Sequence, residues 1–242
     1  MRLLITRPEP DATLYKERLA ELGHTGVVAP LTTITFAKGQ LPLNGVQAVV
    51  VTSKNALRAL ARSPSLAKAV ALPIFTVGPG SGDMAAELGF DRIIPGPASA
   101  RELVQVVATR GEPSGRPLLV LTGDRQAFDM KSALAACGFS VGQKTVYRTA
   151  AAEALEPQVV KAIGSGAIDG VILMSPYSAE VFATLTAEAG ITEAARHLHY
   201  FCLSPAVAKR LGPIPPGNFH VATAPNSEEM LALVTRLAAK SH

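Results

Sequence analysis

The 242-residue sequence predicts an α/β fold of two doubly wound, mainly parallel sheets that arose by internal duplication. Three observations support this prediction. The apolar runs are short and continuous, which is typical of parallel strands buried on both faces. Stretches with helical spacing separate these runs, so strand and helix alternate along the chain. The third observation is an internal repeat, because several segments of the first half return in the second half.

The repeat consists of strand–turn–helix segments that recur in the same order. The pairs are AVVVTSKNALRAL (48–60) with GVILMSPYSAEVF (170–182), IFTVGPGSGDMAAELG (74–89) with YFCLSPAVAKRLG (200–212), and GPASARELVQVVA (96–108) with APNSEEMLALVTRLA (224–238). A weaker echo relates RLLITR (2–7) to PLLVLTG (117–123). The offset drifts slowly, from 122 at Ser53 and Ser175 to 128 at Ser99 and Ser227. This drift indicates duplication of one α/β unit with small insertions, not a solenoid of three or more short repeats.

The expected elements follow from these runs and from their turn signals. Apolar runs predict strands at 2–6, 26–29, 48–51, 74–77, 92–94, 117–121, 141–147, 170–174, 199–203 and 220–222. Helical spacing predicts helices at 11–22, 55–61, 81–88, 100–109, 126–136, 157–163, 178–188, 206–211 and 227–239. In the last of these helices, Ser227 marks the start, and Glu228 and Glu229 place acids in the first turn, where the helix dipole favours them.

Two Thr-rich, β-prone segments, 31–39 and 144–153, interrupt the alternation. If both are extended crossovers, they form a two-stranded linker between domains. The first domain is then discontinuous (1–34 plus 149–242), and the second is inserted (35–148). The alternative, which follows from the repeat alone, is two contiguous halves, 1–110 and 115–242.

The composition excludes several classes of protein. Hydrophobic residues make up 48% of the chain, but no apolar run reaches the roughly 18 residues that span a bilayer. The N-terminal MRLLITRPEP breaks after four apolar residues, so we expect no signal peptide and a cytoplasmic location. Cys137 and Cys202 lie in apolar contexts without metal-ligand spacing, and we expect both to be buried thiols. His197 and His199 have no carboxylate at ligand spacing, so no metal site is expected.

The charge is unevenly distributed. Residues 35–148 contain 13 Lys and Arg against 7 Asp and Glu, whereas the remainder contains 10 against 12. A basic domain favours an anionic ligand through long-range attraction. No basic run, RNA-binding aromatic signature or recognition helix accompanies this surplus, so we expect no nucleic-acid partner.

Small residues follow the predicted strands at equivalent places in both halves. Thr52 and Ser53, Gly78, Ser175 and Ser204 each stand where a strand gives way to a helix. Ligands of open parallel sheets bind beyond the carboxyl ends of the strands, and helix N-termini bind carboxylate or phosphate. Each residue taken alone is also a normal helix cap or turn residue. Their recurrence favours an anion-binding active site in the cleft between two domains.

Six segments in this order resemble the uroporphyrinogen-III synthase family across essentially the whole chain. They are ITRP (5–8), VTSKNA (51–56), TVGPGS (76–81), VYRT (146–149), MSPYSAEVF (174–182) and APNSEEML (224–231). The resemblance implies a carbon–oxygen lyase of tetrapyrrole biosynthesis that cyclises hydroxymethylbilane with inversion of ring D. It also implies two α/β domains joined by a two-stranded linker, with the substrate carboxylates held by backbone N–H groups. We expect no cofactor, no metal, no membrane association, a monomer, and transient contact with the preceding enzyme of the pathway.

The resemblance also assigns roles to single residues. Thr52, Ser53, Ser81 and Ser175 match hydroxyl positions of the family's site, and Tyr147 matches the tyrosine of the return linker. A phenol is protonated at neutral pH, so Tyr147 is the candidate acid for the departing hydroxyl; the alternative is a packing aromatic.

Other positions allow two interpretations or depart from the family. Arg7 either binds substrate or caps a strand end, and Gly123 either contacts substrate through its backbone or only forms a turn with Asp124. Where the family often has a Thr-Thr pair, this chain has Ala206 and Val207, so a hydroxyl is missing there.

A second class of function fits the same architecture. A cytosolic two-domain protein could close on a small anion as a binding protein or sensor, without chemistry. Conversion of hydroxymethylbilane would distinguish an enzyme from such a binder.

Overall fold

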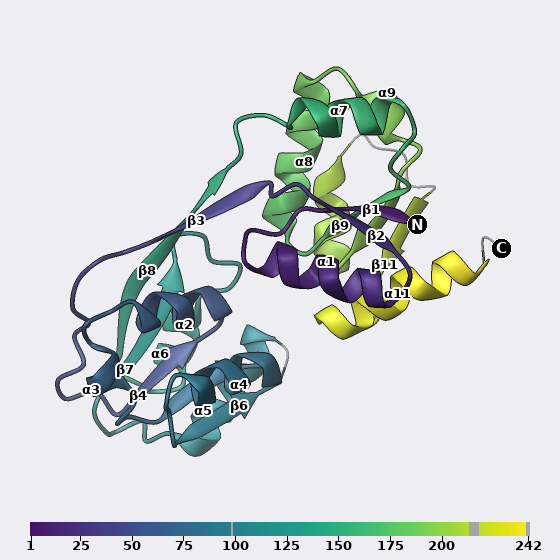
Figure 1. Ribbon diagram of the computed structural model, residues 1–242. Coiled ribbons are helices and arrows are strands. Elements are labelled where there is room, and N and C mark those ends of the chain that lie inside the picture. Colours follow the sequence, from purple (N-terminus) through teal and green to yellow (C-terminus); the bar gives the residue numbers. More distant parts are fainter. Residues whose placement is uncertain (98, 213–217, 241–242) are drawn as a thin grey trace. The chain divides into compact units, whose positions relative to one another are not determined.

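The computed structural model describes residues 1–97, 99–212 and 218–240, and the chain divides into two compact units (Figure 1). Residues 1–33 and 150–242 form the discontinuous unit, and residues 34–149 form the inserted unit. Both are built of strands that alternate with helices. None of the helices formed by the described residues is long and apolar enough to cross a membrane.

The discontinuous unit contains a five-stranded sheet of order β11-β10-β9-β1-β2, in which neighbouring strands are parallel. Its strands are β1 (Arg2–Ile5), β2 (Thr25–Val28), β9 (Gly170–Leu173), β10 (His199–Cys202) and β11 (Phe219–Val221). Helices α1 (Asp11–Glu21) and α11 (Ser227–Lys240) pack on one face. The other face carries α7 (Pro157–Gly164), α8 (Pro176–Glu188), α9 (Thr192–Ala195), α10 (Pro205–Ala208) and the 3-10 turn Lys209–Leu211.

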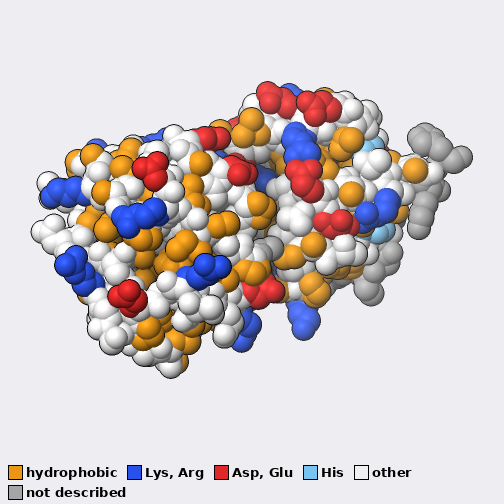
Figure 2. Space-filling model, turned by 90° about the horizontal axis from the view of Figure 1, so that it is seen from below, with side chains coloured by type: hydrophobic (Ala, Val, Ile, Leu, Met, Phe, Trp, Pro, Cys, Tyr) orange, Lys and Arg blue, Asp and Glu red, His pale blue; other side chains and the backbone are white. Residues whose placement is uncertain are grey.

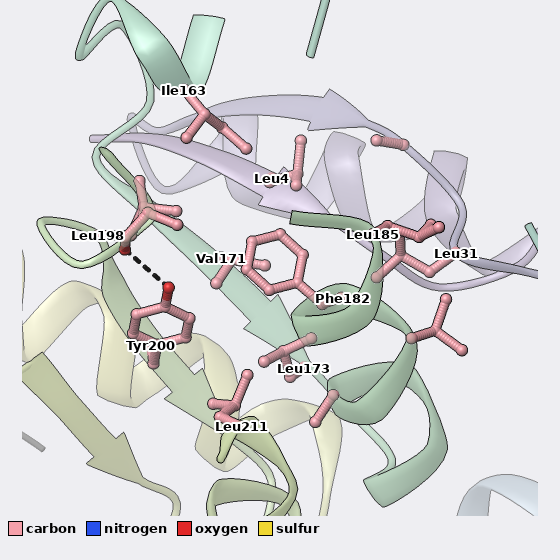
Figure 3. Packing of buried hydrophobic residues seen from close by; sticks show 14 of the residues in the cluster. Leu4, Leu31, Ile163, Val171, Leu173, Phe182, Leu185, Leu198, Tyr200 and Leu211 are labelled. Atoms are coloured by element: carbon pink, nitrogen blue, oxygen red, sulfur yellow. Dashed lines mark hydrogen bonds between the residues drawn. The ribbon is translucent and has the colours of Figure 1, made fainter. Parts of the chain in front are cut away.

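On the face covered by α8, the apolar core of this unit includes a tyrosine, Tyr200. Phe182 of α8 meets Tyr200 of β10 edge to face, with ring centroids 6.1 Å apart (Figure 3). The buried Tyr200 hydroxyl donates to the Ala195 carbonyl oxygen at 2.7 Å (Figure 3). A buried hydroxyl without a partner would destabilise the fold, so this bond allows a tyrosine at the centre of the core.

The inserted unit contains a six-stranded sheet of order β3-β8-β7-β4-β5-β6. Its strands are β3 (Thr32–Phe36), β4 (Ala48–Val51), β5 (Ile74–Val77), β6 (Ile93–Gly96), β7 (Leu118–Gly123) and β8 (Val141–Ala151). Helices α2 (Lys54–Ala61), α3 (Leu66–Ala69) and α4 (Pro79–Glu87) pack on one face, and α5 (Ala100–Arg110) and α6 (Met130–Ala136) on the other. Every residue of β4 and β7 is buried, as expected for central strands covered on both sides.

The two sheets share one topology, which supports the predicted duplication. The order β2-β1-β9-β10-β11 corresponds to β8-β7-β4-β5-β6, with β9 equivalent to β4 and β1 equivalent to β7. The repeated sequence segments fall on these equivalent elements. The strand order 2-1-3-4-5 of the discontinuous unit is that of flavodoxin-like sheets.

Strands β3 and β8 carry the chain between the units. They are neighbours in the sheet, and the Ala37 N–H donates to the Val146 carbonyl oxygen at 2.8 Å, while the Ala152 N–H donates to the Leu31 carbonyl oxygen at 2.9 Å. The two Thr-rich segments are therefore extended and paired, as a two-stranded linker requires.

Several element boundaries differ from the sequence prediction. Helices α4 and α8 begin at Pro79 and Pro176, two residues early, because proline is well tolerated in the first turn of a helix. Helix α6 begins only at Met130, since the Asp129 side chain caps it by accepting the Ser132 N–H at 3.0 Å. The helix expected at 206–211 is two short turns, and the four-residue helices α3 and α9 were not predicted.

Candidate functional site at the carboxyl ends of the strands

In each sheet, two adjacent central strands form a switch point, because the connections that follow them run in opposite directions along the sheet. In the inserted unit β4 leads to α2 and the adjacent β7 leads to α6. In the discontinuous unit β9 leads to α8 and the adjacent β1 leads to α1. Ligands of open α/β sheets bind in the crevice at such points. Five of the predicted residues lie at the ends of these four strands: Arg7, Thr52, Ser53, Gly123 and Ser175.

Thr52 and Ser53 connect β4 to α2. Ser53 has an extended backbone and is the N-cap of α2, where its Oγ accepts the Asn55 N–H at 3.1 Å. Thr52 is partly exposed. The first N–H groups of α2 thus lie beside the end of a central strand, where they can bind an anion.

Gly78 and Ser81 lie at the start of α4, next to the end of β5. Gly78 precedes the helix with φ of 70°, a conformation that glycine adopts without strain. Ser81 is 7% exposed, and its hydroxyl forms no hydrogen bond within the described part of the chain. The Ser81 hydroxyl at the first turn of α4 is therefore available for a ligand.

Lys54 is a residue of this region that the sequence interpretation missed. Its Nζ lies 3.2 Å from the point that a Cβ on Gly80 would occupy, so the ammonium group lies over the first turn of α4. A cation is unfavourable near the positive end of a helix. An anion bound there would be stabilised both by the ammonium group and by the N-terminus of α4. The available signal was a lysine at the first position of α2, where acidic residues are usually favoured.

Tyr147 and Gly123 are brought together as paired residues of β8 and β7. Tyr147 is half-buried and packs against the core on the α2 face of the sheet. The neighbouring Asp124 accepts the Thr149 N–H through Oδ1 at 2.9 Å, and its own N–H donates to the Tyr147 carbonyl oxygen at 3.1 Å. The structure thus places Tyr147 beside the switch point of the inserted unit.

Ser175 and Ser204 begin helices α8 and α10 of the discontinuous unit. The Ser175 Oγ accepts the Ser178 N–H at 3.0 Å and lies 2.8 Å from the Ser178 Oγ. Ser204 has an extended backbone, but its side chain makes no capping bond. Ala206 and Val207 stand where the family that the sequence resembles often has two threonines. Val207 is buried in the core whereas Ala206 is exposed, so only Ala206 lies at the surface.

Arg7 connects two helices of the discontinuous unit. Its guanidinium donates to Asp11 at 3.1 Å and to the Ser227 Oγ at 3.2 Å, and it lies 5.9 Å from the Tyr15 ring centroid. The cap of α11 is Asn226, whose side chain accepts the Glu229 N–H at 2.8 Å. Ser227 therefore begins α11 as predicted, but its hydroxyl binds Arg7.

Neither thiol, and none of the imidazoles in the described part of the chain, is among the predicted site residues. Cys202 is buried as expected, and burial raises the pKa of its thiol to about 12; Cys137 is partly exposed, which corrects the prediction for that residue. The His199 Nδ1 and His220 Nε2 are 3.1 Å apart on β10 and β11. No group of three or more potential ligands for a metal occurs among the described residues.

Neither the visible charge pattern nor two cavities lined by described residues single out another site. On the face shown in Figure 2, Lys and Arg side chains of the inserted unit are scattered among apolar and neutral atoms. One cavity of about 260 Å³ is lined by α8 and the end of β8, and another of about 570 Å³ by β6 and α5. None of the predicted site residues lines either cavity. The strand ends are therefore the better candidate site, because the backbone N–H groups of several helix N-termini lie there.

Comparisons with known proteins agree with this architecture. The family described as uroporphyrinogen-III synthase HemD matches residues 14–232. A uroporphyrinogen-III synthetase from Helicobacter pylori 26695 has a similar structure, with a TM-score of 0.65 and 16% identity, covering 98% of this chain and 100% of that one. A mutant uroporphyrinogen III synthase from the extremely thermophilic bacterium Thermus thermophilus gives a TM-score of 0.56 and 14% identity, covering 100% of both chains. These two structures show the fold. No curated protein sequence matches the chain.

Proposed function

Because this chain belongs to the uroporphyrinogen-III synthase family, we propose that it converts hydroxymethylbilane to uroporphyrinogen III, as a carbon–oxygen lyase. The observation that carries this proposal is the family match over residues 14–232, on a fold shared with two solved members. Family membership makes it an enzyme of haem biosynthesis and leaves the alternative, a binding protein without chemistry, unfavoured. A cytoplasmic location, a monomeric state and transient contact with the preceding enzyme belong to the same proposal.

The substrate carries eight carboxylates, and we assign them to the strand ends of both units. Helix N-termini at Ser53, Gly78 and Ser175 supply backbone N–H groups, and Thr52, Ser81, Ser204, Arg7 and the Gly123 backbone add contacts. Lys54 adds a positive charge at the start of α4. Charge-assisted hydrogen bonds of this kind are about twice as strong as neutral ones. Many separate contacts can thus hold the flexible, anionic substrate in one folded conformation.

The proposed chemistry begins with loss of the hydroxyl group from ring A as water. This leaves an electrophilic azafulvene, which the substituted carbon of ring D attacks. The resulting spiro intermediate fragments and recloses, so ring D is inverted. The main contribution of the protein is to hold the two reacting carbons together. Hydroxide is a poor leaving group, so Tyr147 donates a proton or a strong hydrogen bond to it.

Analysis of the product isomer tests the proposal. Purified protein is incubated with hydroxymethylbilane, and the porphyrins are separated after oxidation. We expect the type III isomer, whereas spontaneous closure gives the type I isomer without inversion. If the protein yields only type I, the proposed function is wrong.

Replacing the Tyr147 hydroxyl tests the proposed acid. We expect Tyr147→Phe to lower kcat at least tenfold, because general acid catalysis contributes about 10²–10⁴-fold. The melting temperature should stay close to that of the wild type, since the ring still packs against the same core. A Phe variant with a normal rate and product would make Tyr147 a packing residue.

A further inference from the structure

Strands β7 and β8 pair with an irregular register at Tyr147. Thr122 pairs with Thr145, but Gly123 pairs with Tyr147, so Val146 is an extra residue. Such a β-bulge reorients the side chains that follow it. Strict alternation would place Val146 and Tyr147 on opposite faces, yet both pack against the core on the α2 face. The bulge therefore turns the tyrosine ring toward the end of β7.

Gly123 gives the ring the space that it occupies. A Cβ on Gly123 would lie 2.5 Å from Cε2, 2.6 Å from Cζ and 2.9 Å from the hydroxyl oxygen of Tyr147. These distances are far below an ordinary carbon contact of about 3.5 Å. The φ of Gly123 is not in the left-handed region, so its backbone conformation does not require glycine. The close approach of the tyrosine ring is what requires glycine at this position.

Asp124 holds the backbone on both sides of Arg148. Its N–H donates to the Tyr147 carbonyl oxygen at 3.1 Å, and its Oδ1 accepts the Thr149 N–H at 2.9 Å. Tyr147 is thus fixed by the bulge, by the missing Cβ of Gly123 and by the two hydrogen bonds of Asp124. We propose that Gly123 and Asp124 are positioning residues for the Tyr147 hydroxyl, a role that rests on the proposed function of Tyr147.

The substitution Gly123→Ala tests this inference with a matched control. The added methyl group should displace the ring by about 1 Å, and such a displacement of a catalytic group can cost up to about 100-fold in rate. We expect kcat to fall between about tenfold and 100-fold and KM to change less than about threefold. Because the half-buried ring can move, the variant should stay folded. The control is Gly142→Ala on the same strand pair, where a Cβ would meet no atom closer than a Leu119 methyl group at 3.6 Å.

A double variant separates positioning from a general loss of structure. If Gly123 acts through the hydroxyl of Tyr147, Gly123→Ala should lower the rate of the Tyr147→Phe enzyme less than about twofold, because effects through one group are not additive. An equal loss on both backgrounds would overturn the inference. For Asp124, the Asn variant retains an oxygen acceptor and should keep near-normal kcat, whereas the Ala variant should not. Equal losses in both Asp124 variants would contradict its role.

A structural measurement makes the test independent of activity. Crystal structures, or NMR spectra with labelled tyrosine, should show the Tyr147 ring displaced in Gly123→Ala and unmoved in Gly142→Ala. A ring that remains in place in Gly123→Ala would overturn the inference. If instead the ring moves but Tyr147→Phe has a normal rate, the proposed catalytic role of Tyr147 fails and the positioning of its ring stands.

Discussion

The two serines at the switch points already serve the fold as helix caps. Ser53 and Ser175 accept N–H groups of the helices that they cap, at 3.1 and 3.0 Å. A hydroxyl oxygen used in this way adds little to substrate binding, which favours the backbone N–H groups as the main carboxylate contacts. Ser204 makes no capping bond. Comparing variants of Ser175 and Ser204 therefore separates the effect of helix capping from the effect of substrate binding.

We predict that Ser175→Ala lowers the free energy of unfolding by about 1 kcal/mol, the usual value of an N-cap. Ser204→Ala should leave it nearly unchanged. Both variants should retain kcat/KM within about tenfold of the wild type, since a hydrogen bond contributes about 1 kcal/mol net. Denaturant unfolding and steady-state kinetics measure these effects. A loss above about 100-fold in either variant would instead identify a side-chain catalyst, because general acid–base groups contribute at least that much.

Sequence reasoning located single residues where a local motif positions them. Thr52, Ser53 and Ser175 were predictable because a strand–turn–helix motif fixes their place and the motif occurs twice. The contact of Gly123 with Tyr147 was not, because it depends on strand register and on a bulge that no local pattern reveals. The position of Lys54 over Gly80 likewise depends on how α2 packs beside α4.

At the scale of elements, the edge of the smaller sheet contains an imidazole pair. The His199 Nδ1 on β10 lies 3.1 Å from the His220 Nε2 on β11, so one ring donates to the other. Burial, and then repulsion from His199, lower the pKa of His220 below its ordinary value of 6.5. As the pH falls below 6.5, the unfolded chain therefore takes up the proton first.

Because this pKa is lower in the folded state, the contribution of His220 to stability should be constant well above pH 6.5 and decline as the pH falls below it. We predict a steeper fall of melting temperature between about pH 6.5 and 5 for the wild type than for His220→Gln, which cannot titrate. His24 also has a lowered pKa and contributes equally to both proteins. Identical pH profiles would show that His220 does not couple protonation to folding.

Regular elements were predictable and short ones were not. Central strands such as β4 and β9 are continuous apolar runs, and their bounds agree with the prediction within one residue. The helices α3 and α9 have four residues each, which is too short for an amphipathic period to be recognised. Strand β3 was anticipated only as an extended segment, because its partner β8 lies far away in the sequence.

For the whole molecule, the internal repeat carried more information than any single motif. It predicted the duplication of one α/β unit, and the matching strand orders of the two sheets support this. The charge imbalance is also a property of whole units. Residues 35–148, which make up nearly all of the inserted unit, contain 13 Lys and Arg against 7 Asp and Glu, and the proposed substrate has eight carboxylates.

We therefore predict that KM for hydroxymethylbilane rises several-fold between about 0.05 and 0.5 M NaCl, with kcat little changed. Salt shortens the range of charge attraction, from about 10 Å at 0.1 M to about 3 Å at 1 M. Sucrose at equal osmolarity serves as the control for effects other than screening. A KM that does not respond to salt would leave the charge surplus of the inserted unit without a role in binding.

Two lysine variants distinguish a local contact from the general charge of the inserted unit. Lys54→Met removes the ammonium group at the start of α4, whereas Lys68→Met removes an exposed charge from α3 in the same unit. Both lower the net charge by one, so an effect of total charge would be equal in the two. We expect Lys54→Met to raise KM about tenfold and to flatten its salt dependence, because a hydrogen bond to a charged group contributes about 1.5–3 kcal/mol. Lys68→Met should change KM less than about twofold, since a solvated surface charge contributes little. Equal shifts in both variants would contradict a substrate contact at Lys54 and leave only long-range attraction.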